Sequence, residues 1–372
     1  KGVSSLEDRN GWHGKPLQEK DLDKALQEIG PAPCIDSKTF VRPPRKARRP
    51  RWVKSFSFEK TAYADKTATR LAYGIGLQSL ARVNGWVVAL DGDVKNSTYA
   101  DKFFDSFPER SFQSFIAEQN MVGMGMGMSA KGFIPFIATF AAFLSRAHDQ
   151  VRMAAYSFAN LKLCGSHVGV SIGEDGPSQM GLEDLAIFRP IPGCVVLYPS
   201  DAFSAEACVQ AAARHRGLVY IRTTRPATPL LYSRGEKFPV GGSKILRRDE
   251  GDAVTVIAAG ITVFEALKAW AELQKEKIGL RIIDAYSVQP LDRATILREV
   301  AETGGRAVVV EDHFPAGGLG EAVAAALAGS ARIRHLCVRD LPRSGKPAEL
   351  LDAFGISSSH IVRAAKKLIE HS

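Results

Sequence analysis

The sequence is poor in cysteine and has no long hydrophobic run. Its 372 residues include five cysteines, and no two of them form a Cys-x-x-Cys pair. An odd number without such pairs argues against a disulfide framework or a cysteine-built zinc site, and favours reduced thiols. No apolar run approaches the roughly 20 residues of a membrane-spanning helix, and no signal-peptide pattern opens the chain. These absences predict a cytoplasmic protein that does not interact with membranes.

Acidic residues are absent from one short basic segment, between Arg42 and Arg51. The chain carries a net charge of +9, of which this segment supplies six, so the remainder carries only +3. The segment also contains Pro43, Pro44 and Pro50, which favour an extended surface linker. We therefore interpret the positive charge as a solvated linker and do not expect nucleic-acid binding.

Strand-like and helix-like segments alternate along the rest of the chain. Residues 1–60 read as a tail and basic linker with one short helix at 21–29. Strands are predicted at 86–90, 133–139, 161–170 and 218–223 in a first domain, 61–236, and at 253–259, 280–286, 307–311 and 333–338 in a second, 237–372. The alternation predicts two doubly wound α/β domains with mainly parallel sheets.

A carboxylate and an aromatic pair mark the stretch 115–146. Glu118 follows the apolar run 115–117, where a strand is expected to give way to a helix. An apolar environment there would raise the pKa of its carboxyl group and let it hold or pass a proton. Phe140 and Phe143 are three residues apart, which predicts that both rings share one helix face and could support a flat heterocycle. The alternative is a capping glutamate and two core phenylalanines.

Further polar residues follow the predicted strands of the first domain. Because the carboxyl ends of parallel strands meet at one edge of a sheet, these side chains are expected to form a site. Arginine beside histidine and serine suits a phosphate, since a guanidinium group binds it through two hydrogen bonds. Each residue alone could equally be a helix cap, a turn residue or a surface ion pair. The residues are Asp93, Ser97, His167, Asp175, Gln179, Arg222 and Arg225.

Eight sequence runs together resemble transketolase, and they cover the C-terminal part of that family almost end to end. Gln179 stands where yeast-like and plant-like members carry histidine, so the resemblance is to the animal-type branch. The runs are WHGK at 12–15, LDGDVKNST at 90–98, IAEQN at 116–120, TFAAFLSRAHDQ at 139–150, CGSHVGVSIGEDGPSQM at 164–180, IRTTRP at 221–226, VEDH at 310–313 and LPRSGKPAELL at 341–351.

The resemblance implies roles for individual residues around thiamine diphosphate. Glu118 would hydrogen-bond the aminopyrimidine ring and favour the tautomer that removes the reactive proton, a transfer usually worth 10²–10⁴-fold in rate. Phe140 and Phe143 would stack on that ring, with Arg146 at its edge and Asp93 nearby.

It also implies how a sugar phosphate would be bound. His13 would lie near the reacting carbonyl group, with a catalytic role, and Lys15 beside it. Asp175 would recognise the neighbouring hydroxyl group, with Gln179 close by. The phosphate would be held by Arg70, Ser97, His167 and Arg225.

One part of the family pattern is missing. The family binds the diphosphate through Mg²⁺ or Ca²⁺ held by a GDG motif in an N-terminal domain, and no GDG occurs here; Asp91-Gly92-Asp93 has a different order. We therefore expect the metal ligands on an N-terminal half that is either a separate subunit or was removed upstream of Lys1. The resemblance also implies a twofold dimer of such pairs, with the second domain serving dimerisation and packing.

The sequence thus predicts the C-terminal component of a transketolase of the pentose phosphate pathway. It would transfer a two-carbon ketol unit from a ketose phosphate to an aldose phosphate, and only together with the N-terminal half. Two alternatives stay open: a non-catalytic regulatory or sugar-phosphate-binding homologue, and a β-type subunit of a 2-oxo-acid dehydrogenase. The second predicts no arginines for a sugar phosphate.

Overall fold

The computed structural model describes residues 3–6, 16–31 and 61–370, and divides the chain into two units. In the first unit the predicted helix is found as α1 (Glu19–Ile29), which ends at Gly30 with a positive φ of 74°. Leu22, Leu26 and Ile29 are exposed on it. The basic run 42–51 lies outside the described residues.

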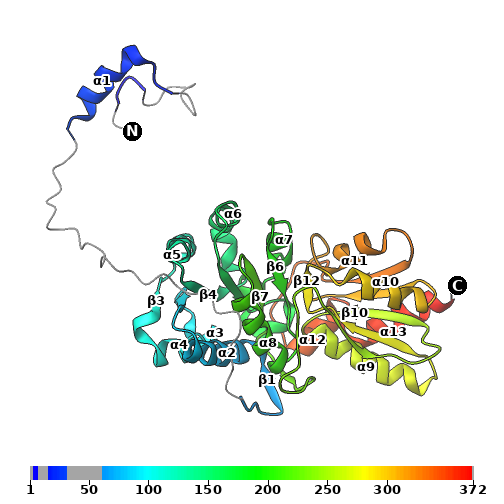
Figure 1. The fold of residues 1–372 in the computed structure, drawn as a ribbon. Coiled ribbons are helices and arrows are strands. Elements are labelled where there is room, and N and C mark those ends of the chain that lie inside the picture. Colours follow the sequence, from blue (N-terminus) through cyan, green and yellow to red (C-terminus); the bar gives the residue numbers. More distant parts are fainter. Residues whose placement is uncertain (1–2, 7–15, 32–60, 371–372) are drawn as a thin grey trace. The chain divides into compact units, whose positions relative to one another are not determined.

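The second unit contains a seven-stranded sheet, ordered β12-β6-β7-β5-β4-β2-β3 (Figure 1). Neighbouring strands are parallel except that β12 runs antiparallel to β6. The central strands are buried on both faces, as expected for a parallel sheet covered by helices. The strands are β2 (Val87–Asp91), β3 (Ser111–Gln113), β4 (Ile134–Phe140), β5 (Lys162–Ser166), β6 (Val195–Leu197), β7 (Val219–Arg222) and β12 (Ser287–Gln289).

Alternate residues of these strands face two different helix layers. Val87 and Ala89 face the core formed with α2 (Thr69–Val83), α4 (Asp101–Ser106) and α8 (Ala202–Arg214). Val88 and Leu90 face the opposite core, formed with α5 (Glu118–Ala130), α6 (His148–Tyr156) and α7 (Asp184–Phe188) (Figure 1). The short helix α3 (Lys95–Thr98) follows β2. This period of two is the one that places successive side chains on opposite sheet faces.

A five-stranded sheet, ordered β14-β13-β10-β11-β9, forms the C-terminal part (Figure 1). It is parallel except for its edge strand β9. One face packs on α9 (Thr262–Lys275) and α13 (Ser358–Glu370), and the other on α10 (Arg293–Glu302) and α11 (Leu319–Leu327). The strands are β9 (Lys244–Arg247), β10 (Val254–Ala258), β11 (Leu280–Asp284), β13 (Arg306–Val310) and β14 (Arg332–Leu336); α12 (Pro347–Ala353) precedes α13, and β1 (Lys66–Ala68) pairs with β8 (Ala227–Pro229).

The two sheets are connected through the strand β12 and through a shared hydrophobic core. β12 follows β11 of the second sheet, yet Ser287 pairs with Leu197 of β6 in the first. A single buried cluster runs from Val88 and Ile137 of the first sheet to Ile257 and Val309 of the second. The model confirms the predicted fold class of two doubly wound, mainly parallel α/β sheets. The cross-sheet strand β12 was not predicted, because three residues carry no periodic signal.

The prediction of a strand at 115–117 is wrong. β3 ends at Gln113, and Phe115 adopts a positive φ of 53°. Phe115 and Ile116 are exposed, with 69% and 68% of their surface accessible. Apolarity alone suggested the strand, but the sheet edge is completed by residues 111–113, and residues 115–117 form the turn that leads into α5.

Within the parts of the chain that the model describes, no helix combines the length and apolarity needed to cross a bilayer.

Candidate functional site

Polar side chains from four segments meet at the carboxyl edge of the first sheet. Arg70 lies in the first turn of α2, and Ser97 lies in α3 after β2. His167 follows β5 directly, and Arg225 follows β7. These parallel strands lie close together in the sheet, so residues distant in sequence come together after them, as was predicted.

The contacts among these residues form a connected polar cluster. The Nη1 atom of Arg70 donates to the Ser97 carbonyl oxygen at 2.8 Å and lies 3.5 Å from Nε2 of His167. Oδ2 of Asp175 lies 3.7 Å from that same Nε2 and 3.0 Å from Nε of Arg225. The Arg225 guanidinium and the His167 imidazole therefore contact the Asp175 carboxylate, and Arg70 joins the cluster through His167. Ser97 takes part through its backbone carbonyl, whereas its hydroxyl was expected to bind phosphate.

His167 is held as a neutral imidazole in this cluster. Its side chain is only 2% exposed, and burial together with the positive charges of Arg70 and Arg225 lowers its pKa to about 3. Nδ1 lies 2.8 Å from the Ser166 hydroxyl oxygen. The residue adopts a positive φ of 60°, which ends β5 at Ser166, four residues before the predicted end of that strand. At neutral pH the site thus presents two fixed cations and an uncharged ring.

Three aromatic rings stack beside the polar cluster. The Phe140 ring centroid lies 3.7 Å from that of His167 and 5.1 Å from that of Phe143, with interplanar angles of 22° and 19°. The prediction that both phenylalanines share a helix face is wrong: Phe140 is the last residue of β4, and Phe143 begins a 3-10 helix, Phe143–Ala147. A spacing of three suits a helix, but here the chain turns at the strand end and brings the rings together.

Glu118 is the first residue of α5 and is 2% exposed. Its Oε2 atom lies 3.3 Å from Nη1 of Arg146, whose side chain is 60% exposed. Among the described residues Oε2 has no hydrogen-bond partner. Ala117 occupies the N-cap position of α5, so Glu118 does not act as the N-cap residue. A buried carboxylate oxygen of this kind needs a partner, because an unsatisfied buried polar group is costly. The geometry suits a flat, nitrogen-containing heterocycle.

The loop after β2 depends on a residue that sequence reasoning missed. The buried carboxylate of Asp91 accepts hydrogen bonds from the Val94 N–H at 2.7 Å and from the Thr98 hydroxyl at 2.9 Å. Burial raises the pKa of Asp91 to about 6. Asp93 itself is exposed, with a φ of 68°, and accepts from the Gln113 side chain at 3.2 Å. An acidic residue at the end of a buried strand was the available signal for Asp91.

Arg222 does not line the site, although it ends β7 as predicted. It is fully buried and forms two hydrogen bonds with the Asp184 carboxylate, at 2.7 and 3.0 Å. Gln179 is half-buried in a 3-10 helix, Pro177–Gln179, on the loop that carries Asp175. His13 and Lys15 lie outside the described residues. Within the described ranges, no group of three or more histidine, cysteine, aspartate or glutamate side chains could hold a metal ion.

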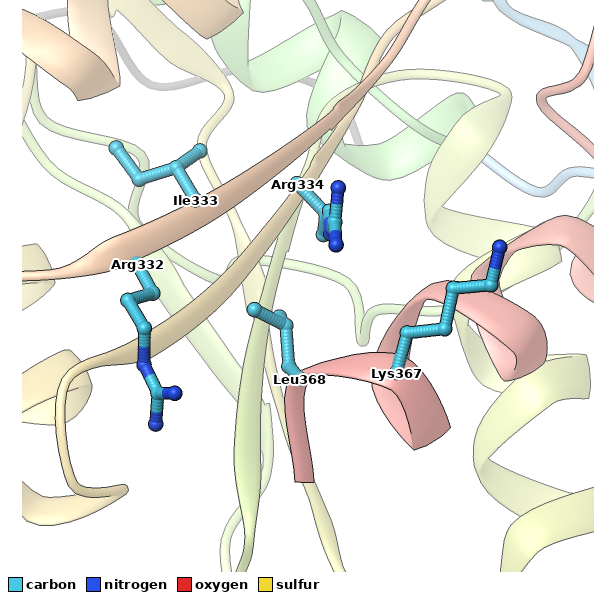
Figure 2. Close-up of a pocket in the computed structure, with 5 residues that line it drawn as sticks. All are labelled: Arg332, Ile333, Arg334, Lys367 and Leu368. Atoms are coloured by element: carbon cyan, nitrogen blue, oxygen red, sulfur yellow. The ribbon is translucent and has the colours of Figure 1, made fainter. Parts of the chain in front are cut away.

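A cavity of about 320 Å³ lies elsewhere, between β14 and the end of α13. Figure 2 shows Arg332, Ile333 and Arg334 on the strand, and Lys367 and Leu368 on the helix. None of these residues belongs to the polar cluster. The residues that line this cavity include no carboxylate and no histidine, so the cluster at the first sheet is the better candidate for chemistry.

Known proteins are similar to this chain in sequence and domain composition. Residues 65–229 match the family model of the transketolase pyrimidine-binding domain, and residues 243–361 match that of the transketolase C-terminal domain. The chain is 46% identical to transketolase-like protein 1 of Bos taurus and 45% identical to transketolase of Mus musculus; each match covers 99% of this chain but only 63% and 60% of the relative.

Solved structures agree with these matches. A chain described as a split-gene transketolase, inactive beta4 tetramer, superposes with a TM-score of 0.75 at 36% identity, covering 82% of this chain and 99% of the other. A transketolase from Leishmania mexicana has the same fold, with a TM-score of 0.69 at 22% identity over 84% of this chain and 47% of the other.

Proposed function

Because the chain belongs to the transketolase family, we propose that it is the C-terminal component of a thiamine-diphosphate-dependent transketolase. It transfers a two-carbon ketol unit from a ketose phosphate to an aldose phosphate in the pentose phosphate pathway. The observation that carries the proposal is the buried Glu118 oxygen, which has no hydrogen-bond partner among the described residues and is paired with the exposed Arg146 of the same 3-10 helix that supplies Phe143.

Three features of this chain fit the pyrimidine ring of thiamine diphosphate. Glu118 holds a carboxyl group at a buried position where it can exchange a proton with a ring nitrogen. Phe143 is half-buried in the stacked pair, so it offers an aromatic face for the ring, while Phe140 behind it keeps water out. Arg146 lies at the edge. When bound, the cofactor supplies a carbon nucleophile that attacks the substrate carbonyl group.

The polar cluster fits the phosphate and hydroxyl groups of the sugar. Arg70 and Arg225 supply two permanent positive charges, suited to a phosphate dianion. Asp175 is held between Arg225 and His167, where its carboxylate can accept a hydrogen bond from a sugar hydroxyl. Since this carboxylate already neutralises part of the cationic charge, a bound phosphate competes with it for Arg225. The neutral ring of His167 then becomes a hydrogen-bond partner for the phosphate.

The remaining half of the site is assigned to a partner. We propose that an N-terminal diphosphate-binding half, on a separate subunit, carries the Mg²⁺ or Ca²⁺ ligands, and that two such pairs form a twofold dimer. Support comes from the similarity to the split-gene transketolase chain, at 36% identity and with a TM-score of 0.75. The chain spans about 60% of the length of the curated relatives. Residues 61–236 and 237–372 are proposed as its two domains, with His13 and Lys15 contributing to the substrate site.

The experiment is native mass spectrometry of the purified assembly, followed by an assay of any pair it contains. We expect a second polypeptide of the diphosphate-binding type, and ketol transfer only when both are present with thiamine diphosphate and Mg²⁺. The non-catalytic alternative is favoured by one observation: the similar split-gene transketolase chain, as a beta4 tetramer, is inactive. That alternative is confirmed if the complete pair binds a sugar phosphate but catalyses no ketol transfer.

A further inference from the structure

The loop that carries Asp175 is built mainly on the second domain. Residues 168–181, the 168–181 loop, follow β5 of the first sheet. Val170, Ile172 and Met180 nevertheless lie in the buried cluster formed by β10, β13, α9, α12 and α13. They are 0–2% exposed. The loop is therefore covalently part of the first domain, whereas these three apolar side chains belong to the core of the second.

The neck of this loop is closed by backbone hydrogen bonds. The Gly169 N–H donates to the Gly181 carbonyl at 2.8 Å, and the Gly181 N–H donates to the His167 carbonyl at 3.0 Å. Arg222 donates to the Gly181 carbonyl at 3.0 Å and to the Asp312 carbonyl at 2.9 Å. This buried arginine thus links the end of the loop to the second domain.

The beginning of the loop is fixed by the side chain of Asp312, which follows β13 and is fully buried. Oδ1 accepts from the Val170 N–H at 2.7 Å, and Oδ2 accepts from the Ser171 N–H at 3.2 Å. A Cβ atom on Gly169 would lie 2.0 Å from Oδ2, and Gly169 has a positive φ of 76°. Only glycine permits so close an approach of the loop to this carboxylate.

Two more glycines bring the loop against the first residue of α12 and the segment before it. A Cβ atom on Gly173 would lie 3.0 Å from Cδ of Pro347, and one on Gly176 would lie 2.7 Å from the Ser344 hydroxyl oxygen; both glycines have a φ of 85°. Between them is Asp175. On its other side Arg225 contacts the loop, donating to the Ile172 carbonyl at 3.2 Å. Residues of both domains therefore fix the position of Asp175.

We propose that Asp312 is a positioning residue: through the 168–181 loop, the second domain sets where Asp175 meets Arg225, His167 and the substrate. This assigns the second domain a part in substrate recognition beyond dimerisation and packing, and it rests on the proposed function of the site. The two hydrogen bonds that the Asp312 side chain accepts require a carboxylate. Each of its oxygens accepts one loop N–H, whereas an asparagine would turn an NH₂ group towards one of them and leave that N–H unsatisfied.

The test compares Asp312→Asn with Glu311→Gln. The neighbouring Glu311 is also buried, and it also accepts two backbone N–H groups, those of Leu319 and Gly320, but at the start of α11. Hydrogen exchange is measured on both variants of the full chain. We expect about tenfold or faster exchange at 170–176 in Asp312→Asn and unchanged exchange there in Glu311→Gln, because losing one buried hydrogen bond changes a local opening equilibrium by that order.

The second measurement is steady-state kinetics with the N-terminal half present. Asp312→Asn is expected to raise KM for sugar phosphates about tenfold, since a small misplacement of a binding group is costly, with kcat changed much less and thiamine diphosphate affinity unchanged. Glu311→Gln is expected to keep the wild-type KM. Faster loop exchange with an unchanged KM would reduce Asp312 to a structural residue and overturn the proposal.

Two results would need a further experiment: an Asp312→Asn variant that does not fold, and a wild-type pair that shows no ketol transfer. If Asp312→Asn does not fold, Ile172→Val and Ile172→Ala test the same anchorage in graded steps, and the proposal requires KM to rise from the first to the second. If the wild-type pair transfers nothing, the proposed function fails. Positioning is then decided by protection of the 168–181 loop in exchange experiments with ribose 5-phosphate, which Asp312→Asn must weaken and Glu311→Gln must not.

Discussion

His167 gives the sharpest prediction about the chemistry of the free site. Its pKa is lowered to about 3 by burial, Arg70 and Arg225, whereas an unfolded histidine titrates near 6.5. The folded state therefore binds this proton less readily than the unfolded state. Stability from keeping His167 neutral is fully present above pH 6.5 and is lost as the pH falls towards 3.

The perturbation is His167→Asn. Asparagine tolerates the positive φ of 60° at this position and has no titrating group. With each pH unit below 6.5, the free energy of unfolding of the wild type should fall by about 1.4 kcal/mol more than that of the variant. Between pH 7.5 and 4.5 the free energy of unfolding of the wild type should fall by about 2.7 kcal/mol more than that of the variant.

Urea unfolding at pH 7.5, 5.5 and 4.5 measures this difference. Contributions from other titrating groups cancel in the comparison to the extent that they are independent of His167. A third protein, the variant Arg225→Met, lacks one of the positive charges that lower the pKa of His167. Its loss of unfolding free energy on acidification should therefore lie between the losses of the wild type and of His167→Asn. Parallel pH profiles for wild type and His167→Asn would refute a neutral, buried His167.

Three further predictions concern the site and its support. Glu118→Ala should leave the unfolding midpoint nearly unchanged, because Arg146 beside it is exposed, yet abolish ketol transfer by the complete pair; turnover near the wild-type rate would remove the proton-transfer role. Arg225→Lys should raise KM for phosphorylated substrates by one order of magnitude or more, since lysine cannot form two parallel hydrogen bonds, and an unchanged KM would exclude it from the phosphate site. Asp184→Ala should destabilise the chain in urea by about 3–5 kcal/mol, because the buried Arg222 loses its counter-ion, whereas a loss below about 1 kcal/mol would mean that water reaches this pair.

Local sequence patterns determined the fold class and most regular elements. Strands with a continuous apolar run, such as β10 and β13, were predicted within one residue of their bounds, because burial of both strand faces leaves a clear apolar signal. Short elements and turns were not predictable in this way. β12 and the turn at 115–117 depend on pairing and chain direction, which a few residues do not encode.

For the site, the order of polar residues after strands already indicated that His167, Asp175 and Arg225 come together. The family resemblance added Arg70, and the quoted sequence runs indicated the family. Sequence could not separate Arg225, which contacts the cluster, from Arg222, which is buried against Asp184, since both lie near the predicted end of the same strand. In the structure Arg222 is the last residue of β7, whereas Arg225 lies three residues beyond it, in the segment that contacts Asp175.

The sequence by itself determined which groups are available: the carboxylates, guanidinium groups and aromatic rings, and the parallel sheets that bring their loops to one edge. Only the tertiary structure decided how those groups are held. The stacked order of Phe143, Phe140 and His167, the buried oxygen of Glu118 beside Arg146 and the support of the Asp175 loop by Asp312 all arise from contacts between segments far apart in the chain. Such contacts leave no local pattern, because each partner alone satisfies the rules of an ordinary turn or strand end.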